Sequence, residues 1–221
     1  MSWNDLFVNM DNTNFFNFSF LPKYGSAFVR GFEYTLMLAV VSVLLAVIPA
    51  LLLAMMRLSK IKPIKWFAGA YIAVFRSTPM LVQLSIIYFG LFHYISLPRT
   101  LLFGFIAINR FIPGVVALAL NSSAYVAEIF RAGILAVDKG QTEAARSLGL
   151  SSWQSMRLVV LPQAIKNVLP ALANELVTMV KESSICSMLG MAEIMYTAQA
   201  VAGNSYITLS PYVLAAIIYF C

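Results

Sequence analysis

The sequence predicts an all-α integral membrane protein in which five transmembrane helices form a single domain over residues 1–221. Hydrophobic residues make up 61% of the chain and charged residues only 11%, against about a quarter charged residues in soluble domains. Long apolar runs also recur, and a bilayer core about 30 Å thick needs about 20 mainly apolar residues in a helix. The predicted helices cover about 32–56, 66–92, 113–137, 164–191 and 206–221.

The first four runs reach the length of a bilayer span, but the fifth does not. It begins at Tyr206 and stops at Cys221, which at about 1.5 Å per residue falls short of a full crossing. Two explanations stay open: either the chain stops inside its last helix, or that helix lies differently from the others.

Lys and Arg residues predict which way the helices cross, because short cytoplasmic loops are enriched in them. Basic residues concentrate after the first run and between the third and fourth runs, and they are fewer on the opposite side. This distribution predicts an N-terminus outside the cell and a cytoplasmic C-terminus. The predicted cytoplasmic basic residues are Arg57, Lys60, Lys62, Lys65, Arg131, Lys139, Arg146, Arg157 and Lys166.

Several functional classes find no support in the sequence. The net charge of +6 comes from residues spread between apolar runs, a pattern typical of membrane topology and not of a nucleic-acid surface. Cys186 and Cys221 stand in apolar stretches without zinc-type spacing, so we expect both to pack as small apolar side chains. The chain has no GxxxxGK[ST], HExxH or GxSxG string. We therefore expect no catalytic residue, no metal and no cofactor.

A polar stretch between the third and fourth runs predicts two short cytoplasmic helices. Gln141–Leu148 is rich in helix formers, and Gly149 is placed to end this helix in a left-handed cap. Ser151 and Gln154 have the spacing of a capping box for a second helix, which we expect Pro162 to terminate. On composition alone, a solvated helical hairpin that joins two spans explains the stretch equally well.

The same stretch resembles a known family. Glu143, Ala144 and Ala145 are followed after three residues by Gly149, and after nine more by Val159–Pro162. This pattern is similar to the EAA loop in permease subunits of binding-protein-dependent ABC importers, with one departure, because the family usually has Ile where Val159 stands. The resemblance implies that the segment 139–162 docks into a groove of a cytoplasmic ATPase. The coupling residues that it implies are Glu143, Ala144, Ala145 and Gly149.

Two further stretches, Tyr71–Gln83 and Asn121–Arg131, resemble the polar amino acid branch of these permeases. The resemblance covers the chain from about Tyr34 to Cys221 and implies a MetI-like core with five membrane helices. Members of the branch carry a basic cytoplasmic tail after the last helix. Since this sequence has none, we expect its C-terminus to be incomplete.

Arg76 stands inside the second run, just before Ser77, Thr78 and Pro79. Pro79 removes a backbone donor and frees the carbonyl of Phe75, so a helix interrupted here would offer backbone groups to an ion or a zwitterion. A charge within a span is a functional candidate by default. Alternatively, the Arg76 side chain extends to the cytoplasmic headgroups.

Polar residues also form a stripe on each of two later runs. Asn121, Tyr125 and Glu128 are four and then three residues apart. Glu175, Thr178 and Glu182 are three and then four residues apart. Each set therefore shares one helical face. Such faces fit a water-filled path for an amino acid. An acidic group would bind the substrate ammonium, and a basic group or a helix N-terminus would bind the substrate carboxylate. The predicted substrate-pathway residues are Thr78, Gln83, Asn121, Ser122, Tyr125, Glu175, Lys181 and Glu182.

Structural roles are the competing explanation for some of these residues. Asn121 and Ser122 would simply join helices through hydrogen bonds. Lys181 and Glu182 would neutralise groups on a partner subunit.

Together these features predict the transmembrane subunit of an ATP-driven importer of polar amino acids in a bacterial inner membrane. Because the chain lacks an ATP-binding string, the partners that the resemblance implies are a cytoplasmic ATPase, a second permease subunit, identical or related, and an external amino acid-binding protein. An ion-coupled secondary transporter or channel subunit is the alternative. It explains the charges within the spans but neither the EAA-like helices nor the lack of inverted repeats.

Overall fold

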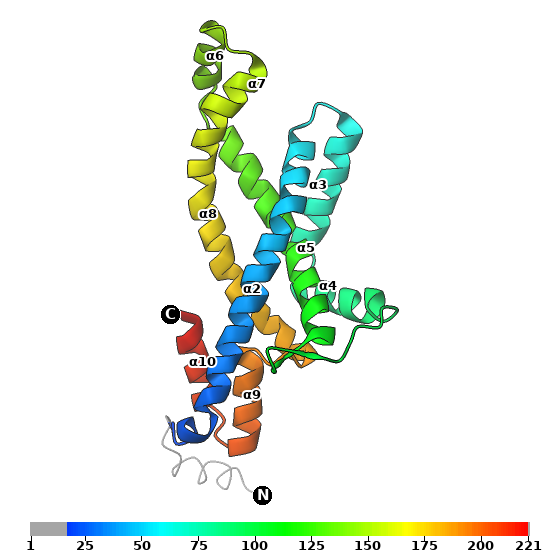
Figure 1. Ribbon diagram of the computed structural model, residues 1–221, viewed down its shortest axis with the longest axis vertical. Coiled ribbons are helices and arrows are strands. Elements are labelled where there is room, and N and C mark those ends of the chain that lie inside the picture. Colours follow the sequence, from blue (N-terminus) through cyan, green and yellow to red (C-terminus); the bar gives the residue numbers. More distant parts are fainter. Residues whose placement is uncertain (1–16, 221) are drawn as a thin grey trace, which may run out of the picture. The chain divides into compact units, whose positions relative to one another are not determined.

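The computed structural model describes residues 17–220, which fold almost entirely into helices (Figure 1). Two segments, η1 and η2, have π-helical hydrogen bonding, and η3 is a 3-10 helix. The elements are α2 (Leu21–Leu58), α3 (Lys62–Ser77), α4 (Met80–Ser85), η1 (Ile86–Leu91), β1 (Leu101–Leu102), β2 (Ile106–Ala107), α5 (Ile108–Leu135), α6 (Lys139–Ser147), α7 (Ser152–Ser155), η2 (Met156–Val160), α8 (Leu161–Glu182), η3 (Ser183–Leu189), α9 (Ile194–Ser205) and α10 (Ser210–Phe220).

The chain divides into two compact units. Among the described residues, unit 1 contains 17–37, Leu97–Phe111 and 183–220. Unit 2 contains Leu38–Ser96 and Ile112–Glu182. Unit 2 holds every residue predicted for coupling or for the substrate pathway. The single domain expected for the whole chain stays a prediction.

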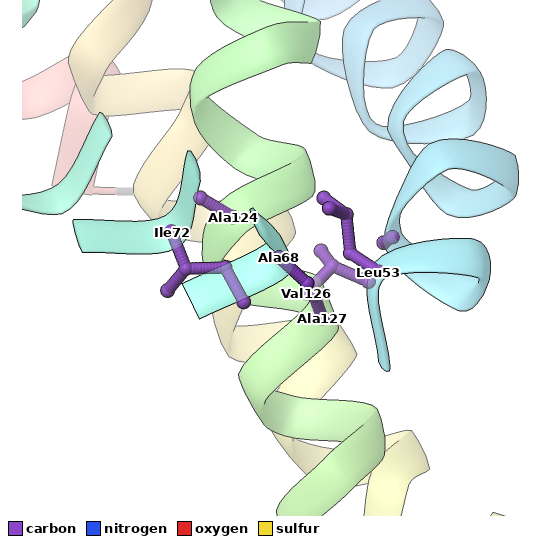
Figure 2. Close-up of a cluster of buried hydrophobic side chains, with 7 residues drawn as sticks. Leu53, Ala68, Ile72, Ala124, Val126 and Ala127 are labelled. Atoms are coloured by element: carbon purple, nitrogen blue, oxygen red, sulfur yellow. The ribbon is translucent and has the colours of Figure 1, made fainter. Parts of the chain in front are cut away.

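Small side chains bring α2, α3 and α5 together in the core of unit 2. Figure 2 shows this cluster, in which small alanines lie between the branched side chains of Ile72 and Leu53. Small residues let membrane helices approach closely, so that dispersion contacts replace the hydrophobic driving force that lipid does not supply. The buried members are Ala50, Leu53, Ala68, Ile72, Ala124, Val126 and Ala127.

The second predicted helix, 66–92, is not one continuous helix. The chain is bent by 106° between α3 and the following pair α4 and η1. Thr78 is extended, with φ −104° and ψ 143°, because the residue before a proline is disfavoured in the helical region. Pro79 then starts a new helix at Met80, since its missing N–H is no loss at a helix start.

By length and composition, α2 and α5 can each cross a membrane, and up to four spans result if each of two bent helix pairs counts as one. Both helices begin earlier than expected, at Leu21 and Ile108. The last expected span, 206–221, contains α10, which has 11 residues and lies below the spanning length; Cys221 itself is outside the described residues. The count of five spans therefore stays a prediction.

In unit 1, a buried carboxylate holds the start of α9. Glu193 is fully buried, and its oxygens accept hydrogen bonds from the backbone N–H groups of Met195 at 2.9 Å and Tyr196 at 2.6 Å. The hydroxyl of Tyr219 on α10 donates to the same carboxyl group at 2.6 Å. Glu193 thus caps α9 and ties it to α10. Cys186 of this unit is buried, as expected.

A short hairpin in unit 1 was not expected from the sequence. Strands β1 and β2 pair antiparallel, with Leu101 opposite Ala107 and Leu102 opposite Ile106. Phe103 and Gly104 in the turn both have positive φ, 53° and 78°. A phenylalanine rarely adopts this conformation, so turn chemistry did not predict the hairpin.

Candidate functional site

The break between α3 and α4 gathers three of the predicted pathway residues. Nε2 of Gln83 donates to the carbonyl of Phe75 at 2.8 Å, to the carbonyl of Thr78 at 2.9 Å and to the Thr78 hydroxyl at 2.7 Å. Asn121 on α5 donates through Nδ2 to Oε1 of Gln83 at 2.8 Å and to the Phe75 carbonyl at 3.3 Å. The carbonyl that Pro79 frees is thus taken up by two buried amides.

The network gives the side-chain amides of Gln83 and Asn121 different roles. Both polar atoms of the Gln83 side chain are engaged within the chain, so Gln83 stabilises the break. Asn121 keeps one open position, because its Oδ1 is buried and has no hydrogen-bond partner among the described residues. A buried acceptor without a partner is costly, which makes Asn121 Oδ1 a candidate contact for water or substrate.

A second polar contact joins α5 to α8. The hydroxyl of Ser122 donates to Oε1 of Glu175 at 2.8 Å. Ser122 is fully buried and only 7% of Glu175 is exposed. Glu175 of the α8 stripe is therefore bound inside unit 2 by Ser122, the residue next to Asn121 of the α5 stripe.

The other polar residues of α8 have different surroundings. Thr178 donates to the carbonyl of Asn174 at 3.0 Å, a bond within the helix, and Lys181 is exposed. Glu182 is half-buried, and its Oε2 has no hydrogen-bond partner among the described residues. Glu175 and Glu182 are seven residues apart and so share one face of α8.

A cavity of about 490 Å³ lies beside the polar face of α5. Tyr125 and Glu128 line it, together with Arg57 and Arg76, and Asn121 does not. The Arg76 guanidinium lies over the Tyr125 ring, 5.2 Å from its centroid, at a distance suited to a cation–π contact. Arg76 thus faces this cavity.

Glu128 in this cavity is already neutralised by two arginines. Arg131 donates to it through Nε at 2.9 Å and through Nη2 at 2.7 Å. Nε of Arg57 lies 3.6 Å from its other oxygen. Sequence spacing grouped Glu128 with Asn121 and Tyr125, but it did not reveal the pairing with Arg57, which is distant in the chain.

The predicted helical hairpin is present at the end of α8. Asp138 caps α6 by accepting from the N–H of Gly140. Gly149 has φ +84°, and the N–H groups of Gly149 and Leu150 reach the carbonyls of Arg146 and Ala145. These two bonds form a Schellman motif, so the left-handed cap is confirmed.

The second short helix begins as expected and ends differently. Ser151 and Gln154 form the full capping box. The prediction that Pro162 terminates this helix is wrong, because Pro162 is the second residue of α8 and the helix runs through it. The π-helical turn η2 precedes it, and such a turn absorbs the hydrogen-bond mismatch that a proline creates.

The four coupling candidates of the hairpin differ in their exposure to solvent. Glu143, Ala144 and Gly149 are exposed, whereas Ala145 is buried. Leu148 and Trp153 are 84% and 70% exposed beside them. In Figure 1 this hairpin and the connection between α2 and α3 lie at the same end of unit 2, as the distribution of basic residues predicted.

A comparison with known protein families matches residues 42–221 to the binding-protein-dependent transport system inner membrane component. The chain belongs to this family. The permease has the MetI-like fold and acts as a membrane subunit of a transport system, as the EAA-like string predicted. The family works with ATPase and binding-protein partners.

Several relatives of this permease cover most of its length. It is 43% identical to the arginine transport system permease protein ArtQ of Bacillus subtilis, over 87% of this chain and 84% of that one. It is 44% identical to the putative glutamine transport system permease protein GlnP of Rickettsia prowazekii, over 85% of this chain and 82% of that one.

Solved structures agree with the fold. A chain from the crystal structure of an amino acid ABC transporter with histidines superposes with a TM-score of 0.82 at 47% identity, over 92% of this chain and 91% of that one. A chain of the MetNI methionine ABC transporter gives 0.67 at 22% identity, over 88% and 90% of the two chains. The second likeness bears on the fold alone.

Proposed function

We propose that this permease subunit forms half of the pathway of an ATP-driven importer for polar amino acids. One observation carries the substrate class: the chain is 47% identical, over 92% of its length, to a chain of an amino acid ABC transporter with the same fold. The relatives named for arginine and glutamine transport support the same class.

The polar groups of unit 2 suit a zwitterionic substrate. Glu175 and Glu182 share a face of α8, and an open carboxylate oxygen on Glu182 offers a place for a substrate ammonium. Asn121 Oδ1 is a second open acceptor. Arg76, which lines the cavity beside Tyr125, offers a cation to the substrate carboxylate. We assign Thr78 and Gln83 to shaping this path, and Ser122, Tyr125 and Lys181 to lining it.

The hairpin α6–α7 is the proposed lever between ATP hydrolysis and the membrane helices. Glu143 and Ala144 are exposed on α6, and Gly149 sets the angle between the two short helices. Ala145 packs inside the hairpin and keeps it rigid. A separate cytoplasmic ATPase would bind this surface and hydrolyse ATP, while a second permease subunit completes the pathway and an external binding protein delivers the amino acid.

This assignment places the hairpin in the cytoplasm, the N-terminus outside and the C-terminus inside. The positive-inside distribution of Lys and Arg supports it. Both basic segments lie at one end of unit 2 (Figure 1). An ion-coupled transporter is not favoured, because the family works with ATPase partners.

Reconstitution of the assembled complex tests the proposal. The permease, its ATPase and its binding protein are placed in liposomes, and uptake of radiolabelled arginine, glutamine and histidine is measured with unlabelled competitors. We expect uptake to require ATP on the side of the ATPase and binding protein on the other side. Uptake driven by a sodium or proton gradient without ATP would contradict the proposal.

A further inference from the structure

A groove with basic walls lies where α2 ends and α3 begins. It has a volume of about 510 Å³, and Arg57, Lys62, Lys65, Trp66 and Gly69 line it. The groove belongs to unit 2, and the end of α2 and the helix α3 form its walls. The positive-inside rule accounts for basic residues in this loop, but it does not account for their arrangement around a cavity.

The charge of the groove is positive. Three of its lining side chains are cations, and none of its lining residues is acidic. Glu128 on the neighbouring helix α5 contacts Arg57 at 3.6 Å and is bound more closely by Arg131 at 2.7 Å. Glu128 is thus shared between two arginines, and the two lysines have no carboxylate partner among the described residues.

The missing side chain of Gly69 shapes the groove. A Cβ atom at Gly69 would lie 3.1 Å from Nη1 of Arg57, closer than ordinary contact. The glycine therefore lets the guanidinium lie against α3, where it forms the inner wall. An alanine here would push Arg57 away from this position.

Apolar side chains surround the cations. Trp66 is 76% exposed, Phe67 61% and Ile61 57%. Tryptophan beside lysine at the end of a membrane helix is typical of the headgroup region, where the ring and the ammonium each find a suitable environment. The groove therefore lies at the level where lipid phosphates are found.

We propose that this groove binds the phosphate headgroup of an anionic phospholipid. Arg57, Lys62 and Lys65 contact the phosphate, and Trp66 packs against the glycerol and the start of the acyl chains. Basic pockets between transmembrane helices on the cytoplasmic side recognise anionic headgroups through these interactions. An acidic protein surface would leave Trp66, Phe67 and Ile61 uncovered, so the lipid is the better fit.

Native mass spectrometry of the purified complex with its ATPase tests this site. The complex is titrated with phosphatidylglycerol and, separately, with phosphatidylcholine of the same acyl chains. Lys65→Gln is compared with Lys60→Gln, which removes the same charge from the same loop but lies outside the groove. We expect Lys65→Gln to weaken phosphatidylglycerol binding about fivefold, since each basic residue near the surface contributes about 1 kcal/mol.

The remaining variants and lipids separate a defined site from a diffuse charge effect. Gly69→Ala is expected to weaken phosphatidylglycerol binding through Arg57, Lys60→Gln to leave it within twofold, and phosphatidylcholine to bind weakly throughout. Equal losses for Lys60→Gln and Lys65→Gln would overturn the proposal. So would equal binding of the two lipids, or loss of the ATPase from Lys65→Gln with phosphatidylglycerol binding unchanged.

Discussion

At the scale of single residues, two amide side chains replace the hydrogen bonds that a proline removes. Gln83 and Asn121 both reach the carbonyl of Phe75, at 2.8 and 3.3 Å. Irregular backbone at membrane depth is tolerated only where the protein itself satisfies it. The side chain of Glu175 accepts a hydrogen bond from one side chain among residues 17–220, the hydroxyl of Ser122. We propose that this carboxyl group contacts the substrate.

Replacing Glu175 with Gln tests this role. The amide oxygen still accepts from Ser122, so we expect the complex to assemble normally. Uptake of the labelled amino acid should fall tenfold or more, because a charge-assisted hydrogen bond contributes about 1.5–3 kcal/mol.

Glu33→Gln is the matched control, since Glu33 is an exposed carboxylate outside the proposed pathway. Its uptake should stay within twofold of the unmodified complex. Unchanged uptake by Glu175→Gln in an intact complex would remove Glu175 from the pathway.

At the scale of elements, the hairpin α6–α7 has a well-capped joint and exposed apolar side chains on its surface. The Schellman motif and the capping box satisfy backbone groups at the joint, so the two helices are held at one angle. Leu148 and Trp153 are exposed beside Glu143. Exposed apolar groups clustered in this way indicate a protein interface.

Reversing the charge at Glu143 tests the hairpin as a lever. We expect Glu143→Lys to lower the amount of ATPase that co-purifies with the permease at least tenfold, measured by quantitative gel analysis of the tagged complex. The helix itself should persist, because Glu143 is exposed and both residues are good helix formers.

Thr142→Lys adds a positive charge at the neighbouring exposed position and serves as the control. It should retain most of the ATPase. Full retention by Glu143→Lys would show that the ATPase does not bind this face of α6.

At the scale of the whole molecule, the proposed orientation in the membrane rests on the distribution of charge. The hairpin and the connection between α2 and α3 lie at one end of unit 2 (Figure 1). Seven of the fifteen Lys and Arg residues fall within 57–65 or 139–157, at or beside these two segments. Basic loops are retained in the cytoplasm during insertion. The segment between α9 and α10 in unit 1 has no Lys or Arg, and its Tyr206 is 91% exposed.

Single cysteines introduced into a chain whose Cys186 and Cys221 are replaced by alanine test the orientation. We expect a membrane-impermeant maleimide to label Tyr206→Cys in intact cells, and to label Trp153→Cys only after the membrane is opened. Labelling of Trp153→Cys in intact cells would place the hairpin outside and exclude contact with a cytoplasmic ATPase.

Local sequence determined the features whose physics is local. Apolar composition requires a membrane fold, Gly149 provides the left-handed cap that ends α6, and Ser151 with Gln154 forms the capping box. Pro79 predicted that the carbonyl of Phe75 would lack its helical hydrogen-bond donor. In each case the interacting groups are close in the chain, so spacing and residue type suffice.

Only the tertiary structure decided which distant groups meet. It brings Asn121 to Gln83 across 38 positions and Ser122 to Glu175 across 53. It also shows that Pro162 continues a helix that the sequence suggested it would end. Helical periodicity places residues on a face, but the partner of that face depends on how the helices pack, which no local pattern encodes.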